Sequence, residues 1–343
     1  MNLVFTKGSS NTTVAFLVLY VDDILLIGND VGHLTDIKKW LATQFQMKDL
    51  RNAQYVLDIQ IVRNRKNKTL AMSQTSYIDK MLSRYKMQNS QKGLLSYRHG
   101  IHLSKEQCPK TPQEVEDISN ILYAAAVGSL MYSMLCTRPD IFYSIGIVSR
   151  YQSNLGRDHS PAVKDILKYL RRTKDDMLVY GSKDLILTGY TDSDFQIDKD
   201  ARKSTSGSVF TLNGGAVMWR SIKQSYIVDS IMEVEYVVAC EAAKEAVWLK
   251  KFLTDLEVVP NMHLPITLYC DNSGAVTNSR EPRSHKRGKH IERKYHLIKE
   301  IVHRGDVIVT KISSKQSMAN SFSKTLTAKV FERHLHGLGL RGL

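Results

Sequence analysis

The sequence has no long apolar run and few cysteines. No stretch approaches the roughly 20 apolar residues that a membrane-spanning helix needs, and no secretory signal pattern opens the chain. The four cysteines are scattered and form no Cys-x-x-Cys pair, which argues against a zinc site or a disulfide set and favours reduced thiols. We therefore expect an intracellular protein without a membrane anchor, either cytoplasmic or nuclear.

Acidic residues are also in deficit. The chain has 48 Lys and Arg against 34 Asp and Glu, and its net charge is +14. Such an excess favours a polyanionic partner, most simply nucleic acid, although a basic soluble protein without such a partner explains the charge about as well. At 343 residues, with 43% hydrophobic residues, the chain is long enough for two or three domains with real cores.

Three acids stand at predicted ends of secondary structure elements in the last part of the chain. Asp192 ends a strand in TGYTDSDF, Glu235 opens a helix in SIMEVEY, and Asp271 ends a strand in ITLYCDN. A two-metal phosphodiester-cleaving site holds divalent ions about 4 Å apart, and such ions prefer hard oxygen ligands. The three acids therefore predict a site of this kind.

Two neighbouring glutamates receive different predicted roles. Ser230 and Glu233 have the spacing of a capping box, which gives Glu233 a structural role at the start of the helix. Glu235 instead begins the stripe that is expected to be buried, which continues through Val238, Ala242, Ala246 and Leu249. An acid that starts the inward face of a helix beside a sheet edge favours a metal ligand.

Near the start of the chain, VAFLVLYVDDILLIGND predicts a hairpin with Asp22 and Asp23 at its tip. Adjacent carboxylates beside buried strands are costly unless something cationic meets them. A solvated turn is the alternative, but the apolar flanks make it less favoured because they place both acids at the edge of a core. The spacing beyond it predicts a helix over His33–Leu50 and paired strands over Tyr55–Val62 and Thr69–Met72.

Residues 74–183 are predicted to be mainly helical, with a polar linker over Gln88–Thr111. The expected helices are Thr75–Met87, Thr111–Asp140, Asp140–Tyr151 and Ser160–Arg172. The last part is predicted to open with three antiparallel strands, the second and third joined by a two-residue turn at Asn213-Gly214. A helix, a strand, a helix, a strand and a final helix follow, with Asn272 or Ser273 as the cap of the second helix.

In combination, the motifs resemble those of copia-type long-terminal-repeat retrotransposons. Tyr20-Val21-Asp22-Asp23 is similar to the YVDD motif of their reverse transcriptases. The segments GYTDSDF, RKSTSG, LNGGAVMW, MEVEY, CDNSGAV, KHIERKYH and SFSKTL resemble their ribonuclease H domains. The resemblance implies an α/β and α+β chain in three parts: a truncated polymerase palm over 1–73, a helical thumb or connection over 74–183, and a ribonuclease H-like domain with a mixed five-stranded sheet over 184–343.

The resemblance also implies an activity: hydrolysis of the RNA strand of RNA–DNA hybrids with two Mg²⁺ ions, or Mn²⁺ in their place. The implied catalytic positions are Asp192, Glu235, Asp271 and Asn320. The family has aspartate where Asn320 stands, so we expect weaker binding of the second ion and reduced turnover.

The reverse transcriptase motif implies metal binding by Asp22 and Asp23. The sequence before this motif is too short to hold the fingers and the upstream palm aspartate, so we do not expect this chain alone to polymerise DNA. The family also has glycine where Arg51 and Asp58 stand, which implies that both positions need a tight backbone.

Basic residues in two polar segments are candidate contacts to a nucleic acid backbone. They are Arg202 and Lys203 in the first segment, and Lys286, Arg287, Lys289 and His290 in the second. A solvated turn is the alternative for the second segment. Three interpretations stay open: a hybrid-cleaving nuclease, a nucleic-acid-binding remnant without catalysis, and a nonfunctional relic of a mobile element. The sequence leaves the oligomeric state open.

Overall fold

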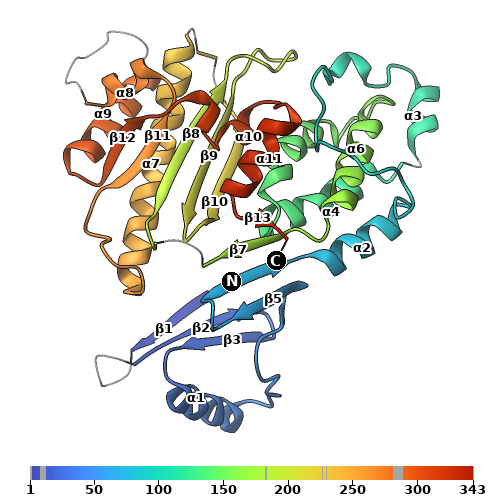
Figure 1. Cartoon of the computed structure of the whole chain (residues 1–343). Coiled ribbons are helices and arrows are strands. Elements are labelled where there is room, and N and C mark those ends of the chain that lie inside the picture. Colours follow the sequence, from blue (N-terminus) through green and yellow to red (C-terminus); the bar gives the residue numbers. More distant parts are fainter. Residues whose placement is uncertain are drawn as a thin grey trace. The chain divides into compact units, whose positions relative to one another are not determined.

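The computed structural model describes residues 2–7, 13–119, 121–181, 184–225, 227–228, 230–280 and 289–342. Internal contacts divide the chain into two compact units, Met1–Ile61 and Val62–Leu343, which are described separately (Figure 1). No helix in the described ranges is both long and apolar enough to cross a membrane.

The first unit contains a three-stranded antiparallel sheet in the order β1-β2-β3. A two-residue turn, Val21-Asp22, joins β2 to β3 and confirms the predicted hairpin. Helix α1 begins after Asp30, whose side chain accepts the His33 N–H, and the prediction of a helix to Leu50 is wrong because the chain is already extended at Phe45. The elements are β1 (Asn2–Lys7), β2 (Val14–Tyr20), β3 (Asp23–Gly28), α1 (Val31–Gln44), β4 (Tyr55–Val56) and β5 (Ile59–Asn64), of which β5 continues into the second unit.

Two non-glycine residues of the first unit have left-handed backbones where the family resemblance implies glycine. The φ angles of Arg51 and Asp58 are 67° and 58°. Asp58 follows Leu57, whose φ is 53°, and the two residues form the tight turn between β4 and β5. The expectation of a tight backbone at Arg51 and Asp58 is confirmed, and side chains there carry a steric cost that glycine avoids.

A helical core fills the first half of the second unit. Its helices are α2 (Thr75–Arg84), α3 (Pro112–Ser119), α4 (Tyr123–Cys136), α5 (Phe142–Val148) and α6 (His159–Arg172). The single helix predicted over Thr111–Asp140 is wrong, because α3 ends at Ser119 and α4 begins at Tyr123. The segment predicted as a linker buries Tyr97 and Leu103 in this core, so it is a packed, irregular segment.

The C-terminal helix α11 (Ala328–Gly337) packs Phe331 and Leu335 into the same helical core. Beside it lies part of a five-stranded sheet, in which three antiparallel strands have the order β13-β7-β6. These strands are β6 (Thr69–Ser73), β7 (Met177–Tyr180) and β13 (Leu340–Arg341). The predicted division of the chain into three domains, 1–73, 74–183 and 184–343, remains a prediction.

A mixed five-stranded sheet in the order β10-β9-β8-β11-β12 forms the other half of the second unit and confirms the predicted ribonuclease H-like architecture. Its strands are β8 (Thr188–Asp194), β9 (Thr205–Leu212), β10 (Gly215–Lys223), β11 (Ile266–Cys270) and β12 (Val307–Lys311). The first three are antiparallel, and β11 and β12 run parallel to β8. The turn at Asn213-Gly214 is confirmed, with φ of 52° and 82°.

Helix α7 (Ile231–Leu256) lies across this sheet, with α8 (Ser273–Arg280) and α9 (Lys289–His303) near it (Figure 1). Its small residues Ala239, Ala243 and Ala246 share a buried core with Leu268 and Val309 of the sheet. Small side chains let the helix axis approach the strands closely. The long helix therefore holds its first turns firmly against the sheet, where α7 carries Glu235.

Candidate metal-dependent active site

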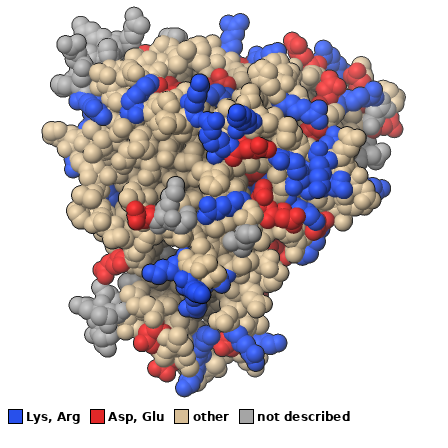
Figure 2. All heavy atoms as spheres, in the orientation of Figure 1, with Lys and Arg blue, Asp and Glu red and all other residues tan. Residues whose placement is uncertain are grey.

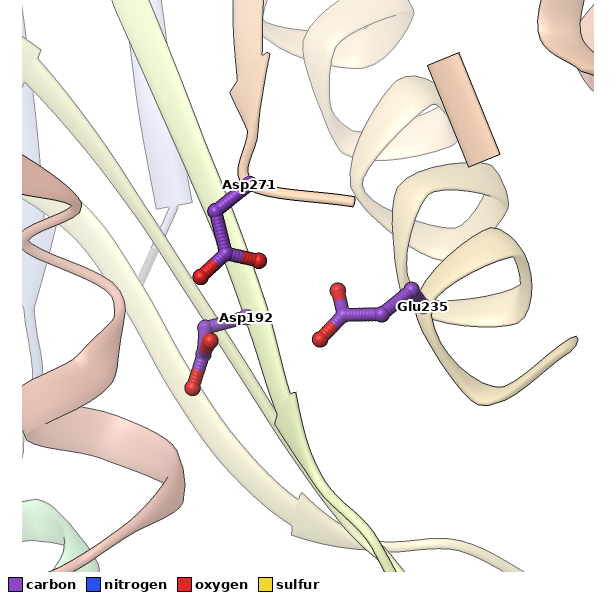
Figure 3. A group of neighbouring side chains, drawn as sticks. All are labelled: Asp192, Glu235 and Asp271. Carbon is purple, nitrogen blue, oxygen red and sulfur yellow. The ribbon is translucent and has the colours of Figure 1, made fainter. Parts of the chain in front are cut away.

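Three carboxylates from three separate elements converge at one edge of the five-stranded sheet (Figure 3). Asp192 belongs to β8, Glu235 to α7, and Asp271 directly follows β11. The parallel register pairs Cys270 with Thr191, so the next residues along, Asp271 and Asp192, are neighbours. One oxygen from each carboxylate lies within 4.8 Å of the others. The prediction that these acids share a site agrees with this geometry.

Two of the three carboxylates are almost fully buried. Asp192 is 1% exposed and Glu235 is 3% exposed. Burial raises the pKa of Glu235, and the nearby charges of Asp192 and Asp271 raise it further. Burial also raises the pKa of Asp192, an effect that the Lys324 ammonium and the Ser323 hydroxyl partly offset. Burial is the main cause of both shifts, and for Glu235 the neighbouring carboxylates add to it.

The start of α7 sets the position of Glu235. Ser230 caps the helix by accepting the Glu233 N–H at 3.2 Å, which confirms the Ser230 half of the predicted capping box; among the described contacts, Glu233 takes part through its backbone. Two residues further, Glu235 Oε1 accepts the backbone N–H of Ser193 at 3.1 Å. This bond ties the helix to β8 and fixes the carboxylate beside Asp192. Asn272 Oδ1 accepts the Ala275 N–H at 3.0 Å, so Asn272 is the residue that caps α8.

Two further residues reach Asp192 from the short helix α10 (Asn320–Ser323) and the position after it. The Ser323 hydroxyl donates to Asp192 Oδ2, and Lys324 Nζ lies 3.0 Å from Asp192 Oδ1. The sequence prediction missed both residues, because 132 positions separate Lys324 from Asp192. The sequence did contain a signal: Ser323 and Lys324 are the second serine and the lysine of the SFSKTL motif.

Asn320 begins α10 and is 3% exposed. Its side-chain nitrogen donates to the Ser314 carbonyl at 2.5 Å, whereas its buried Oδ1 has no hydrogen-bond partner among the residues that the structure describes. A buried amide oxygen left without a donor is unusual and costs free energy. A cation or an ordered water at that oxygen would satisfy it. The catalytic role of Asn320 remains a prediction.

Comparisons with known proteins show the family to which the chain belongs. The family model described as reverse transcriptase (RNA-dependent DNA polymerase) matches residues 2–95. The Pol polyprotein of transposon TNT 1-94 from Nicotiana tabacum is 41% identical over 96% of this chain and 24% of its own length. That of transposon RE1 from Arabidopsis thaliana is 31% identical over 98% of this chain and 22% of its own length. The chain belongs to the copia-type retrotransposon Pol family.

This Pol chain therefore spans about a quarter of the length of the curated polyproteins that it matches. An uncharacterised mitochondrial protein of Arabidopsis thaliana is 30% identical over 68% of this chain and 93% of its own length. A ribonuclease H1 isolated from compost has a solved structure that matches 44% of this chain and 99% of its own, with 14% identity and a TM-score of 0.32. The strand order of the sheet, rather than that score, carries the fold assignment.

The reverse transcriptase motif of this Pol chain lies at the exposed tip of the β2–β3 hairpin. Asp22 and Asp23 are both exposed, so the expectation that they sit at the edge of a core is wrong. The acid cluster found among the described residues contains Asp192, Glu235 and Asp271, without Asp22 or Asp23. Metal binding by Asp22 and Asp23 remains a prediction.

The loop after β8 carries two of the predicted nucleic acid contacts and is fixed at its base. Arg150 Nη1 and Lys223 Nζ bind Asp198 at 2.7 Å and 2.5 Å. Arg202, further along the loop, is exposed, and Lys203 is half-buried. The loop joins the paired strand ends at Asp194 and Thr205, and contact of Arg202 and Lys203 with a nucleic acid remains a prediction.

The other predicted contacts lie outside the described part of the structure. Lys286 and Arg287 belong to residues 281–288, and only the backbone of Lys289 and His290 is described, in α9. On the face shown in Figure 2, basic side chains are interspersed with acidic ones. The charge of the Pol chain alone therefore does not mark out a nucleic acid surface on that face.

Proposed function

We propose that residues 184–343 form a ribonuclease H-type endonuclease that hydrolyses the RNA strand of RNA–DNA hybrids and requires Mg²⁺, with Mn²⁺ as an alternative ion. The observation that carries this proposal is the convergence of Asp192, Glu235 and Asp271 on an edge of a ribonuclease H-like sheet. The matching motifs of the copia-type Pol family support the choice of substrate.

The residues present fit a divalent cation. They offer carboxylate oxygens, which Mg²⁺ prefers, and the single ammonium group at Asp192 leaves the three acids under-compensated. Asp192, Glu235 and Asp271 would hold the ions, and the Asn320 amide oxygen is a further candidate ligand. Bound ions of this kind generate a nucleophilic water and stabilise the leaving oxygen.

The chain itself supplies orientation and a pre-formed site. The Ser193 N–H fixes Glu235, and the Ser323 hydroxyl fixes Asp192, so these carboxylates do not need to be ordered when a ligand arrives. Burial of both keeps bulk water away from their oxygens. Arg202 and Lys203 are the proposed contacts to the nucleic acid backbone, and the 2′-hydroxyl is the group that distinguishes an RNA strand from DNA.

Cleavage of a labelled RNA–DNA hybrid tests the proposal. With purified chain and Mg²⁺, we expect RNA fragments from the hybrid, none from a DNA duplex, and none in the presence of EDTA. Asp192→Asn should abolish cleavage, whereas Glu233→Gln, on the same helix as Glu235 but used only through its backbone at the cap, should retain it. Cleavage that survives in Asp192→Asn would contradict the proposed site.

Asn320 favours a second candidate: a remnant that binds nucleic acid without catalysis. An amide in place of the family's aspartate brings no charge to the site, and Asn320 already gives its nitrogen to Ser314. Salt-sensitive hybrid binding without cleavage would support this alternative. A folded protein that neither cleaves nor binds the hybrid would leave the interpretation of a nonfunctional relic.

A further inference from the structure

Both oxygens of the Asp192 carboxylate are engaged by donors of the protein itself. Lys324 Nζ binds Oδ1 at 3.0 Å, and the Ser323 hydroxyl binds Oδ2. Asp192 is 1% exposed, so water cannot easily replace these donors. A cation that approaches Asp192 therefore meets a carboxylate that is already paired with a positive charge.

The element that carries these donors is held in place by close packing. An added Cβ at Gly207 of β9 would lie 2.7 Å from the Ala319 carbonyl oxygen and 2.9 Å from Phe322 Cβ. Phe322 is fully buried in a small core with Val209 and Leu338. The glycine thus lets α10 seat against the sheet and present Ser323 and Lys324 to Asp192.

The two donors differ in how they can leave. The side chain of Lys324 is 31% exposed, so its ammonium group can move towards water. Ser323 is fully buried, and its hydroxyl has a second acceptor in the Asn320 carbonyl at 3.3 Å. A buried carboxylate paired with a partly exposed lysine is suited to exchange one cation for another.

We propose that Lys324 is a displaceable counter-ion: its ammonium group pairs with Asp192 in the metal-free protein and gives way when a divalent cation binds the acid cluster. The inference rests on the proposed metal-dependent function and adds a competitor for the metal within the chain. A monovalent ammonium cannot match a divalent ion against three carboxylates, so the exchange favours the metal. The displaced ammonium then adds positive charge at the mouth of the site, where an anionic backbone would approach.

Binding of Mn²⁺ to the metal-free full chain, measured by calorimetry at pH 8, tests the exchange without any substrate. Lys324→Met removes the competing charge-assisted hydrogen bond, and we expect Mn²⁺ to bind about three- to tenfold more tightly than to the wild type. Lys324→Arg keeps the charge and should bind like the wild type. Lys244→Met, which removes an equal charge from an exposed pair with Glu241, is the matched control.

A second measurement uses the unaltered protein and does not depend on the folding of a variant. Reductive methylation of lysines, read by mass spectrometry, should label Lys324 several-fold faster with saturating Mg²⁺ than in EDTA. Lys250, paired with Asp306 at 3.3 Å, should show no such change.

Two results would overturn the inference in distinguishable ways. If Mn²⁺ binds the wild type and binds Lys324→Met with the same or weaker affinity, the exchange is rejected and the nuclease proposal stands. The same conclusion follows if the labelling of Lys324 does not depend on Mg²⁺. If neither protein binds Mn²⁺, although circular dichroism shows that both are folded, the exchange and the metal-dependent function are rejected together.

Discussion

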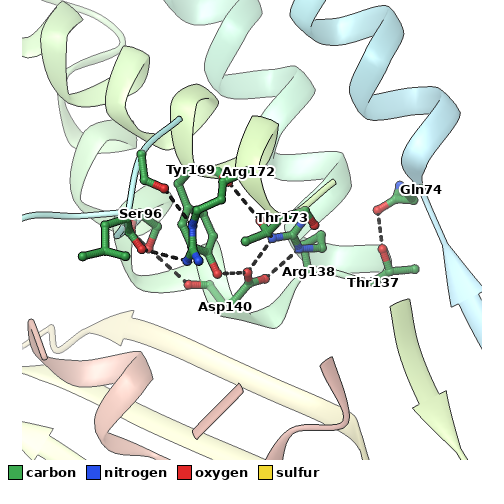
Figure 4. A network of polar contacts seen from close by, with 11 residues as sticks. Gln74, Ser96, Thr137, Arg138, Asp140, Tyr169, Arg172 and Thr173 are labelled. Carbon is green, nitrogen blue, oxygen red and sulfur yellow. Dashed lines mark hydrogen bonds and ion pairs between the residues drawn. The ribbon is translucent and has the colours of Figure 1, made fainter. Parts of the chain in front are cut away.

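Two buried groups of charged side chains in the second unit differ in their charge balance. Arg138 and Asp140, both 1% exposed, pair with each other in the helical core (Figure 4). The guanidinium binds both oxygens of Asp140 at 3.0 Å and 2.7 Å, and Tyr169 donates to Asp140 at 2.6 Å. At the sheet edge, the ion pair to the three carboxylates among the described residues comes from the partly exposed Lys324, which binds Asp192, whereas Lys311 donates to the backbone carbonyl of Asp271. We infer that the balanced cluster holds the helical core together and that the unbalanced one is built for a ligand.

The contact that completes each cluster comes from far along the chain. Arg138 also donates to the carbonyl of Thr173 at 3.0 Å, which joins the end of α4 to the end of α6. At the other site, Lys324 reaches Asp192 from the far end of the unit. In the first case the remote contact satisfies a buried charge completely, and in the second it does so only in part.

Breaking the balanced cluster should have the largest effect on stability. Arg138→Met leaves the Asp140 carboxylate buried without its cation, and we expect the free energy of unfolding to fall by about 3–5 kcal/mol. Urea denaturation measures the change. Arg98→Met, at an exposed pair with Asp165, should cost less than about 1 kcal/mol. A loss in Arg138→Met no greater than in this control would contradict the structural role.

At the acid cluster, removal of a charge is expected to increase the stability of the protein. Glu235→Gln removes a buried charge and keeps an oxygen for the Ser193 N–H. In EDTA at pH 8, we expect the variant to be more stable than the wild type by about 2 kcal/mol. The same urea experiment measures it. Destabilisation by a similar amount would mean that the acid cluster is a structural element like the one around Arg138.

The pH dependence of stability follows from the raised pKa values. Burial and neighbouring charges raise the pKa of Glu235 to about 8, and burial raises that of Asp192 to about 6. Because the folded state holds these protons more tightly than the unfolded state, their contribution to stability is present at low pH and lost as pH rises through these values. The stability difference between Glu235→Gln and the wild type in EDTA should therefore widen between about pH 5 and pH 8, and thermal unfolding across this range measures it. A difference that stays constant would contradict the raised pKa.

The smallest change in stability is expected from a substitution at Asn320. Asn320→Asp loses the hydrogen bond to the Ser314 carbonyl, so we expect the metal-free variant to lose about 1 kcal/mol of stability. With Mg²⁺, an added carboxylate ligand should strengthen metal binding and raise the cleavage rate by a few-fold to about tenfold. An unchanged rate and an unchanged metal affinity would place Asn320 outside the metal site.

The acid cluster could be predicted because each of its members stands near the end of an element that the sequence pattern marks, although β8 continues two residues beyond Asp192. Alternation ends at Asp192 and Asp271, and the apolar stripe of α7 begins at Glu235. The tight turn at Asn213-Gly214 was predictable from a local turn signal, whereas the one at Asp58 was expected only because the related family has glycine there. The mixed five-stranded sheet followed from the order of these elements together with the family resemblance.

Contacts between distant segments could not be predicted in this way. The role of Arg138 depends on Tyr169 and Thr173 in another helix, and nothing in the motif TRPD indicates burial. Tyr97 and Leu103 lie in a segment whose polar composition and glycines are typical of a linker, yet the helical core covers them. The pairing of Lys324 with Asp192 likewise depends on the packing of α10 against Gly207, which no local pattern shows.

The most direct test of the charge-balance account is the effect of Mg²⁺ on thermal unfolding at pH 8. The wild type and Glu233→Gln should unfold at clearly higher temperature with millimolar Mg²⁺ than in EDTA, because a cation relieves the repulsion between the buried carboxylates. Glu235→Gln should lose most of this increase, and Arg138→Met, although less stable, should keep it. Equal Mg²⁺ effects in Glu235→Gln and the wild type would contradict the account, since the stabilising ion would then bind elsewhere.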